Sequence, residues 1–428
     1  MKVLGIITEY NPFHNGHKIH LEESIKASKA DSVICIMSGA FLQRGEPSIV
    51  NQWARTKMAL EAGVDLMIQL PISYSLRSAE HFAFGSIKLL NSTGIVDNIC
   101  FGSELGDILP FVELGRILSK EPLALSNLIQ SKLNKGLSYP EARSKALIDY
   151  IRLTPNNLKT TLNTAENILK NPNNILGLEY IKALNKLDSS ITPLTIKREG
   201  EGYHSLKLNK VSSASAIRSQ IYNNYLKERP LINEETSKGL LQESIKILEE
   251  EISKGFGPIF YNNFSQQILT LIRRMDERDL KEFEDIRGGL ENRIKEAAQR
   301  ASSLQELISL IKTKRFTQTR IQRILSQVLL NIKEPDLKKF DKANGPLYFR
   351  VLGFNNKGRE LLKSIKEKGD LPIITKVANH LRSTQDPRNL LQKMLSYDLR
   401  ANNIYSLAYP NLEARKANID FRKHPIIK

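Results

Sequence analysis

Short apolar runs that alternate with helical stretches constrain the fold of this chain more than any other feature. Five such runs occur before residue 200, at 2–8, 32–38, 65–71, 98–104 and 192–199. Stretches with helical spacing separate the first four, over 16–29, 51–63 and 79–94, and the last two of these end in Gly, as helices often do. Apolar strands that alternate with helices are typical of a parallel sheet covered on both faces. We therefore expect a Rossmann-like α/β domain, closed by a short helix over 213–226.

The pattern changes near residue 230. From there on, apolar residues recur at spacings of three and four, which predicts helices over 234–255, 265–275, 290–312 and 320–333. The stretch "KERPLINEE" (227–235) supplies the proline and the charges that are typical of a linker. We predict a parallel-sheet α/β domain over 1–228 and an α-helical C-terminal domain over 229–428.

Charge is distributed unevenly between these two parts. Residues 1–120 hold 11 Lys and Arg against 12 Asp and Glu, so the other 308 residues must carry +18 to give the net charge of +17. A near-neutral unit followed by a strongly basic one favours a polyanionic partner such as nucleic acid. Lys-rich helices can also be no more than well-solvated surfaces, and composition alone does not decide between the two.

The cysteines and the N-terminus indicate the compartment. Cys35 and Cys100 lie inside apolar runs, which predicts buried thiols in a reducing compartment instead of a disulfide or a zinc site. The opening "MKVLGIITEY" becomes polar too early for a signal peptide, and no stretch approaches the length of a membrane span. We expect a cytoplasmic protein with no membrane partner.

The segment "HNGHKIH" (14–20) places three of the seven histidines between the first strand and the first helix. A zinc site would need His14, His17 and His20 to converge, but position 20 is swung well round the helix from position 14 and no cysteine lies nearby. We therefore expect no metal held by the protein here. A surface turn built on Asn, Pro and Gly is a second interpretation.

Phosphate binding is the third interpretation of this segment. The carboxyl end of the first parallel strand meets the N-terminus of the next helix there, so backbone N–H groups and the positive helix end converge. Gly16 would let a nucleotide approach the backbone, Thr8 adds a neutral donor, and the imidazoles can donate to phosphate oxygens. Such a site needs no covalent nucleophile, because phosphoryl transfer depends mostly on positioning and charge stabilisation.

"HNGH" after a first strand resembles the H-x-G-H signature of the nucleotidyltransferase superfamily, to which the HIGH-type aminoacyl-tRNA synthetases also belong. A longer set of motifs resembles the bacterial tRNA(Met) cytidine acetate ligase family over essentially the whole chain. These motifs are "EYNPFHNGH" (9–17), "SGAFLQRGEP" (38–47), "WARTKMALEAGVDL" (53–66), "SAEHFAFG" (78–85), "CFGSE" (100–104), "PNNILGLEY" (172–180), "IKREGEGYH" (196–204), "SSASAIR" (212–218) and "GPLYFRVLGFNNKGRELL" (345–362).

The resemblance implies an ATP-dependent ligase. Members of that family activate acetate as acetyladenylate and pass the acetyl group to the exocyclic amine of the wobble cytidine in elongator tRNA(Met). Carried over, it implies His14 and His17 as the catalytic residues on the phosphates. The implied ATP-binding residues are Ile7, Thr8, Glu9, Tyr10, Asn11, Pro12, Phe13, His14, Asn15, Gly16, His17, Lys18, Ile19, His20, Gly102, Asn173, Arg198, Ser213 and Arg218.

Each of the more distant positions also has a plainer interpretation. Gly102 ends the fourth strand, where a glycine can simply begin a turn. Asn173 and its neighbour Asn174 can cap a helix, and the sequence does not say which of them contacts nucleotide.

The same holds for the last two positions. Arg198 can pair with phosphate or stay a solvated charge at a strand end, and Lys197 is an equal candidate. Ser213 opens a stretch that resembles the superfamily's second phosphate motif, and it can equally be a helix cap. Ala214 and Ser215 stand where that motif has Ser and Thr, which weakens the assignment of single hydroxyls.

Two basic segments and one loop complete the candidate set. The segments 312–323 and 414–428 mix Lys and Arg with Phe316 and Phe421, a combination that suits single-stranded anticodon bases, although a basic run is usually a solvated face. The loop "FLQRGEP" (41–47) follows the second strand and reaches the same sheet edge, either as a flap over substrate or as an ordinary connection.

The expected partners are therefore ATP with Mg²⁺ as its counter-ion, acetate as co-substrate, and tRNA bound through its anticodon region. We expect neither DNA nor an obligate protein partner. Two rival functions stay open. One is a nucleotidyltransferase that adenylylates a small phosphorylated metabolite, although the basic helical part would then have no purpose. The other is an RNA-binding or assembly protein that keeps an inactive nucleotide fold.

Overall fold

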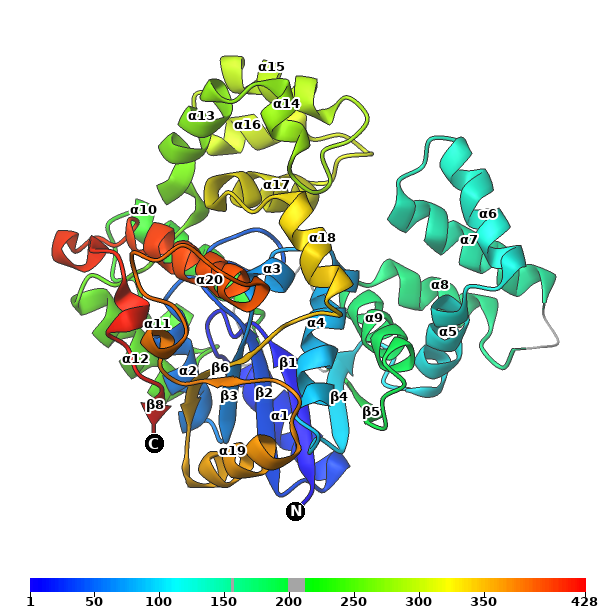
Figure 1. The fold of residues 1–428 in the computed structure, drawn as a ribbon, viewed down its shortest axis with the longest axis horizontal. Helices are drawn as coiled ribbons and strands as arrows, with labels where there is room; N and C mark the ends of the chain where they lie inside the picture. The colour runs from blue at the N-terminus through cyan, green and yellow to red at the C-terminus, as the bar shows by residue number, and fades with distance from the viewer. Residues whose placement is uncertain (155–157, 199–211) are drawn as a thin grey trace.

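A mixed sheet forms the centre of the computed structural model, which describes residues 1–154, 158–198 and 212–428 (Figure 1). Its order is β5-β4-β1-β2-β3-β6-β7, with β8 paired to β6. The strands are β1 (Val3–Thr8), β2 (Ser32–Ser38), β3 (Leu66–Leu70), β4 (Asn98–Ser103), β5 (Thr192–Lys197), β6 (Phe349–Phe354), β7 (Ile373–Ile374) and β8 (Ile426–Ile427). The first five pair in parallel, whereas β6 runs antiparallel to β3.

Helices make up most of the rest of the described residues. In the N-terminal part (1–228) they are α1 (Asn15–Ser28), α2 (Gln52–Glu61), α3 (Ile72–Ser75), α4 (Ala79–Ser92), α5 (Leu109–Lys120), α6 (Leu123–Asn134), α7 (Tyr139–Leu153), α8 (Leu162–Lys170), α9 (Pro172–Lys186) and α10 (Ala214–Leu226). In the C-terminal part (229–428) they are α11 (Glu234–Ser237), α12 (Gln242–Ser253), α13 (Ser265–Arg274), α14 (Glu277–Lys281), α15 (Leu290–Arg300), α16 (Leu304–Ile311), α17 (Gln318–Leu330), α18 (Glu334–Lys342), α19 (Asn356–Lys368) and α20 (Leu390–Ser406).

The α/β fold class with a largely helical C-terminal part is confirmed. The five predicted strands lie at the expected places and pair in parallel. Two predicted helices are each divided in the structure: 234–255 is α11 and α12, and 290–312 is α15 and α16. In the second of these, α16 has its own N-cap. The break falls where Ser303 caps α16, because its hydroxyl oxygen accepts the backbone N–H of Glu306 at 3.2 Å.

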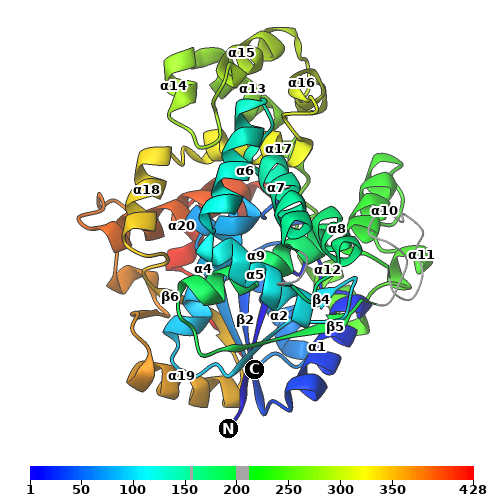
Figure 2. The ribbon, with the colours of Figure 1, turned by 90° about the vertical axis from the view of Figure 1, so that its right-hand side faces the viewer.

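Apolar side chains of alternate strand residues build one core on each face of the sheet. On β2, Val33, Cys35 and Met37 point into one core, and Ile34 and Ile36 point into the other. The first core is covered by α1, α2, α10 and α12, and the second by α4, α9 and α19. Figure 2 shows these helices on both sides of the sheet.

The C-terminal part contributes strands to the sheet, which the sequence pattern did not predict. β6 lies beside β3 and is buried along almost its whole length. Its run "FRVLGF" is apolar enough for a strand covered on both faces, but it stands among helical segments and no neighbouring strand pattern identifies it. The boundary between two domains near residue 228 stays a prediction.

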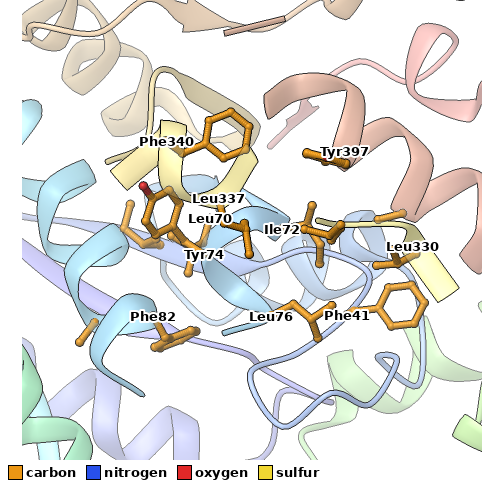
Figure 3. Packing of buried hydrophobic residues seen from close by; sticks show 14 of the residues in the cluster. Phe41, Leu70, Ile72, Tyr74, Leu76, Phe82, Leu330, Leu337, Phe340 and Tyr397 are labelled. Atoms are coloured by element: carbon orange, nitrogen blue, oxygen red, sulfur yellow. The ribbon is translucent and has the colours of Figure 1, made fainter. Parts of the chain in front are cut away.

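A shared core joins the helices of the C-terminal part to the carboxyl edge of the sheet. Figure 3 shows Phe41 from the loop after β2, and Ile72 and Tyr74 from α3, among apolar side chains of α17, α18 and α20. Leu330 and Phe340 belong to those helices and are completely buried. The helical region therefore packs directly over the edge where the parallel strands end.

Two expectations from composition can be checked against the described residues. Cys35 and Cys100 are buried free thiols, as predicted. Among the helices in the described ranges, none combines the length and the apolar character needed to cross a membrane.

Candidate functional site

The turn between β1 and α1 brings two imidazoles face to face. After Ile7 and Thr8 end β1, the chain passes through half-buried Glu9 and four buried residues (10–13) and enters α1 with His14 as the N-cap. His14 Nδ1 accepts the backbone N–H of Gly16 at 3.0 Å, and His17 Nδ1 accepts the backbone N–H of His14 at 3.4 Å. The ring centroids of His14 and His17 lie 3.7 Å apart. The helix begins here because the two rings cap it reciprocally.

These bonds determine which nitrogen of each ring carries the proton. A neutral imidazole that accepts at Nδ1 carries its hydrogen on Nε2, so both histidines present an Nε2–H donor. Burial, followed by the charges of Arg198 and Arg218, lowers the pKa of His14 to about 3. Burial also lowers the pKa of His17 well below its usual value, helped by the neighbouring rings and the same arginines. Both rings are therefore neutral hydrogen-bond donors near pH 7.

Gly102, Arg198 and His20 meet beside this turn. A Cβ on Gly102 would lie 3.0 Å from Arg198 Cγ and 3.4 Å from His20 Cδ2, so a side chain there would crowd both. Burial, followed by the charge of Arg198, lowers the pKa of His20 to about 4. Arg198 follows β5 directly and bonds through its backbone N–H to the carbonyl oxygen of Ser103 at 2.9 Å. Of the motif 196–204, residues 199–204 lie outside the described residues.

Arg218 reaches the same turn from α10. Its Nη1 donates to the carbonyl oxygen of Asn11 at 2.8 Å, and its Nη2 lies 3.6 Å from Glu46 Oε2. Ser213 is the N-cap of α10, with its hydroxyl oxygen accepting from the N–H of Ala216 at 3.2 Å. The cap interpretation of Ser213 is thus confirmed, and the cap fixes the start of the helix that carries Arg218.

Asn173 and Asn174 both hold Glu104, which follows β4. Asn173 Nδ2 donates to Glu104 Oε1 at 2.7 Å, and Asn174 Oδ1 accepts the Glu104 backbone N–H at 2.9 Å. Neither caps α9, because the N-cap is Asn171. Asn174 is completely buried and Asn173 is half-buried. Glu104 Oε2 is buried and has no hydrogen-bond partner among the described residues, so this carboxylate can accept a hydrogen bond from a ligand.

The side chains of residues 10–13 are mostly buried in the core and do not face the imidazoles' exposed side of the turn. Tyr10 and Phe13 are buried, with ring centroids 4.6 Å apart. Pro12 is buried as well, and Asn11 Oδ1 accepts the backbone N–H of Ile49 at 2.7 Å. These side chains support the turn, so a nucleotide would meet this stretch through its backbone.

Residues on the outer side of α1 contact other segments of the chain. Asn15 Nδ2 donates to the carbonyl oxygen of Lys238 at 3.1 Å, and Lys18 Nζ donates to that of Ala62 at 2.9 Å. Ile19 is 40% exposed. The structure therefore gathers His14, Gly16, His17 and His20 at one place and directs Lys18 and Ile19 away from it.

Sequence reasoning missed the buried Arg55 on α2, which ties β1 and β2 together. Its guanidinium donates to the carbonyl oxygens of Glu9 at 2.6 Å and Ser38 at 3.0 Å, and also to that of Gly39. The Glu9 carboxylate in turn accepts the backbone N–H of Gln43 at 2.7 Å. Burial raises the pKa of Glu9. The sequence did hold one indication of this role, because Arg55 stands in α2, a helix whose other residues are mostly buried.

The basic segment around Phe316 differs from the expectation. Phe316 is only 8% exposed, with the guanidinium carbons of Arg315 and Arg320 5.5 and 5.3 Å from its ring centroid. Its ring is therefore covered and is not available for stacking on a base. Phe421 is half-buried. The described residues contain no group of three or more His, Cys, Asp and Glu side chains that could hold a metal ion.

Comparisons with known proteins agree with this geometry. A family model described as HIGH Nucleotidyl Transferase matches residues 1–420. Proteins named tRNA(Met) cytidine acetate ligase from Halothermothrix orenii and Acetivibrio thermocellus are 46% and 44% identical, each over 100% of both chains. The chain belongs to the tRNA(Met) cytidine acetate ligase family. The family predicted from the motifs is therefore confirmed.

Solved structures of this family have the same fold. A Thermotoga maritima structure described as TmcAL bound with alpha-thio ATP has a TM-score of 0.91 at 34% identity, covering 100% of this chain and 99% of that one. A second, described as the apo form of the same protein, has a TM-score of 0.93 at 35% identity over the same shares.

Proposed function

We propose that this chain is an ATP-dependent ligase that makes acetyladenylate from acetate and ATP and then acetylates the wobble cytidine of elongator tRNA(Met). The observation that supports this most directly is the pair of neutral imidazoles, His14 and His17, at the N-terminus of α1 in a chain similar to acetate ligases over its whole length. The tRNA substrate would place the enzyme in the cytoplasm.

The residues present fit a nucleoside triphosphate. The rings of His14 and His17 lie 3.7 Å apart at the N-terminus of α1, and the charges of Arg198 and Arg218 lower the pKa of both rings. Gly102 leaves space where a Cβ would crowd Arg198 and His20. On this proposal, His14, His17, Arg198 and Arg218 bind the phosphates, and Mg²⁺ accompanies ATP as its counter-ion.

The first half-reaction forms the mixed anhydride. A carboxylate oxygen of acetate attacks the α-phosphorus, the bond from that phosphorus to the bridging oxygen breaks, and pyrophosphate leaves. His14 and His17 donate hydrogen bonds as negative charge shifts onto the phosphate oxygens. Neutral donors suit this role, because they stabilise the developing charge without holding product pyrophosphate as strongly as two cations would.

The second half-reaction transfers the acetyl group. The exocyclic nitrogen of cytidine attacks the acetyl carbon, the bond from that carbon to the phosphate oxygen breaks, AMP leaves, and the nitrogen loses one proton to solvent. The imidazoles do not take this proton, because each Nδ1 lone pair already accepts a backbone N–H. An unpaired wobble base would present its amine to the site without disrupting a duplex.

The basic C-terminal part supports tRNA as the partner. Lys312, Lys314 and Arg315 are exposed at the start of the segment that leads into α17. Exposed cations attract the phosphate backbone whatever its sequence, so this surface would supply affinity, while the choice of base would depend on the site. We propose that the anticodon stem approaches across this surface.

The direct test is to incubate the protein with ATP, labelled acetate and total tRNA and to map the modified nucleoside by mass. We expect one acetylated cytidine at the wobble position of elongator tRNA(Met), with stoichiometric AMP and pyrophosphate. Pyrophosphate release that needs a small phosphorylated metabolite, and no tRNA or acetate, would contradict the proposal in favour of a nucleotidyltransferase for such metabolites.

A further inference from the structure

The loop Phe41–Pro47 connects the candidate nucleotide site to the helical region. It leaves the carboxyl end of β2 and is closed by its own backbone. The N–H of Leu42 donates to the carbonyl oxygen of Glu46 at 2.9 Å, and the N–H of Gly45 donates to that of Leu42 at 2.9 Å. An isolated bridge pairs Phe41 with Pro47. The loop is therefore a preformed turn and not a loose flap.

One side of this loop lies directly against α17. Ser326 Oγ donates to the carbonyl oxygen of Gly45 at 2.6 Å, and Gln322 Nε2 donates to Glu46 Oε1 at 3.2 Å. Gly45 has a φ of +92°, and a Cβ there would lie 2.4 Å from the backbone carbon of Gln322, so only glycine fits. Tyr261 holds this part of α17 by donating to the carbonyl oxygen of Gln322 at 2.9 Å.

The other side of the loop faces Arg218. Glu46 Oε2 lies 3.6 Å from Arg218 Nη2, while Arg218 Nη1 donates to the carbonyl oxygen of Asn11 at 2.8 Å. The side chains of Arg218 and Glu46 are 23% and 34% exposed, so water screens this pair only in part. Each carboxylate oxygen of Glu46 has its own partner, one on α17 and one on α10.

These contacts determine where the guanidinium can point. Arginine has four flexible side-chain torsions, and holding it at one orientation before a phosphate arrives removes part of the entropy cost of binding. A guanidinium carries five N–H donors, so the contacts with Asn11 and Glu46 leave donors for a phosphate. Without Glu46, Arg218 would keep one anchor and could rotate about it.

We propose that Glu46 is a positioning residue that holds Arg218 against the β1–α1 turn, and that Gln322 orients Glu46 from α17. This inference rests on the proposed function, since it takes Arg218 to bind the phosphates of ATP. The helical region then contributes to the ATP site without touching ATP.

The test is acetate-dependent exchange of pyrophosphate into ATP, measured without tRNA for the wild type, Glu46→Gln and Glu46→Asp. For Glu46→Gln we expect the KM for ATP to rise about 2- to 5-fold, the range of a partly exposed ion pair, with the KM for acetate unchanged. Glu46→Asp keeps the charge and should recover part of the loss. Because Glu46 is partly exposed, unfolding midpoints should match the wild type.

A double-mutant cycle identifies the route of the effect. Affinity for a non-hydrolysable ATP analogue is measured by calorimetry for the wild type, Glu46→Gln, Arg218→Ala and the double variant. If Glu46 acts through Arg218, adding Glu46→Gln to Arg218→Ala changes the Kd less than about twofold. An unchanged Kd in Glu46→Gln alone, or an equal loss in both backgrounds, would overturn the inference. If the wild type binds the analogue yet performs no acetate-dependent exchange, the proposed function is refuted. The affinities of the four proteins would still test whether Glu46 acts through Arg218.

Discussion

The β1–α1 turn and the contact around Arg77 both bury ionisable side chains, and they do so in opposite ways. In the turn, burial is the main cause of the lowered pKa of His14 and His17, so the rings are kept neutral. Around Arg77, burial acts against the charge, but hydrogen bonds to Asp341 and Glu284 outweigh it and raise the pKa of the guanidinium. The turn keeps its histidines uncharged, whereas the contact around Arg77 keeps the arginine charged by pairing it with two carboxylates.

The two regions also differ in the reach of their contacts. The two imidazoles of the turn accept hydrogen bonds from residues only two or three positions away in the sequence. Arg77 binds Glu284 and Asp341, which are 207 and 264 positions away, and so fastens the loop before α4 to the C-terminal part. We therefore expect the turn to contribute mainly to function and the contact around Arg77 to contribute mainly to stability.

Removing Arg77 should have the largest effect on stability. Arg77→Ala leaves Glu284 and Asp341 without their buried partner, so the free energy of unfolding should fall by about 3–5 kcal/mol. Urea unfolding followed by circular dichroism measures this. Lys88→Ala is the matched control, because it removes a more exposed pair with Asp370 between the same two parts and should cost about 1 kcal/mol or less. Similar losses in the two variants would contradict the distinction.

His17→Ala should have the opposite balance of effects to Arg77→Ala, with a large loss of activity and a small loss of stability. Loss of one preorganised donor should reduce acetate-dependent pyrophosphate exchange by about 10²–10³-fold, equivalent to about 2.7–4 kcal/mol. The lost capping bond should lower the free energy of unfolding by only about 1 kcal/mol, well below the loss in Arg77→Ala. His81→Ala is the control, because His81 is half-buried in the Arg77 contact, where its Nδ1 lies 2.9 Å from Ser78 Oγ. Full exchange activity in His17→Ala would remove the turn from the mechanism.

Acid should weaken the fold through the turn. The pKa of His14 is about 3 in the folded chain and about 6.5 when unfolded, so the unfolded state binds more protons between these values and stability falls as pH drops below 6.5. Between pH 6.5 and 5.5 the loss is about 1 kcal/mol for each such histidine. Buried carboxyls with raised pKa values, such as Asp398 at about 6, act in the opposite sense.

Comparing the pH dependence of stability between the wild type and a variant without these two histidines therefore separates their contribution from that of the carboxyls. Asn can accept the same capping N–H without titrating, so the double variant His14→Asn, His17→Asn should lose less stability than the wild type over that pH range. Urea unfolding at pH 7.0, 6.5, 6.0 and 5.5 gives the two curves. Parallel curves would mean that the rings are not held neutral.

The sequence separation between contacting residues also explains which strands and site residues could be predicted from the sequence. The strands β1 to β5 and the turn at His14 were predictable because apolar runs and turn residues mark them in the sequence itself, even though β4 and β5 pair across the long helical segment between them. The strand β6 was missed because its partner, β3, lies almost 300 residues earlier, and its own apolar run has no local companion.

The same distinction applies within the site. Gly102 and Arg198 could be placed at the carboxyl edge because Gly102 lies near the end of β4 and Arg198 directly follows β5. Glu46 and Arg55 could not be assigned roles, because their partners come from α10, α17 and the ends of two strands. The neutral state of the imidazoles was equally hidden, since it depends on burial that only the packed structure reveals.

The smallest expected effect concerns the basic surface before α17. Lys312→Gln with Lys314→Gln should lower the slope of log affinity for tRNA against log salt by about one for each phosphate that the variant no longer neutralises. Lys366→Gln with Lys368→Gln removes the same charge from exposed positions on α19 and should leave the slope nearly unchanged. Filter binding at several salt concentrations measures both. Because a net-charge effect would lower the two slopes equally, only unequal slopes support a tRNA path over the helical region. Equal slopes would mean that the surface attracts RNA without placing it, and the route to the imidazoles would then have to lie elsewhere on the chain.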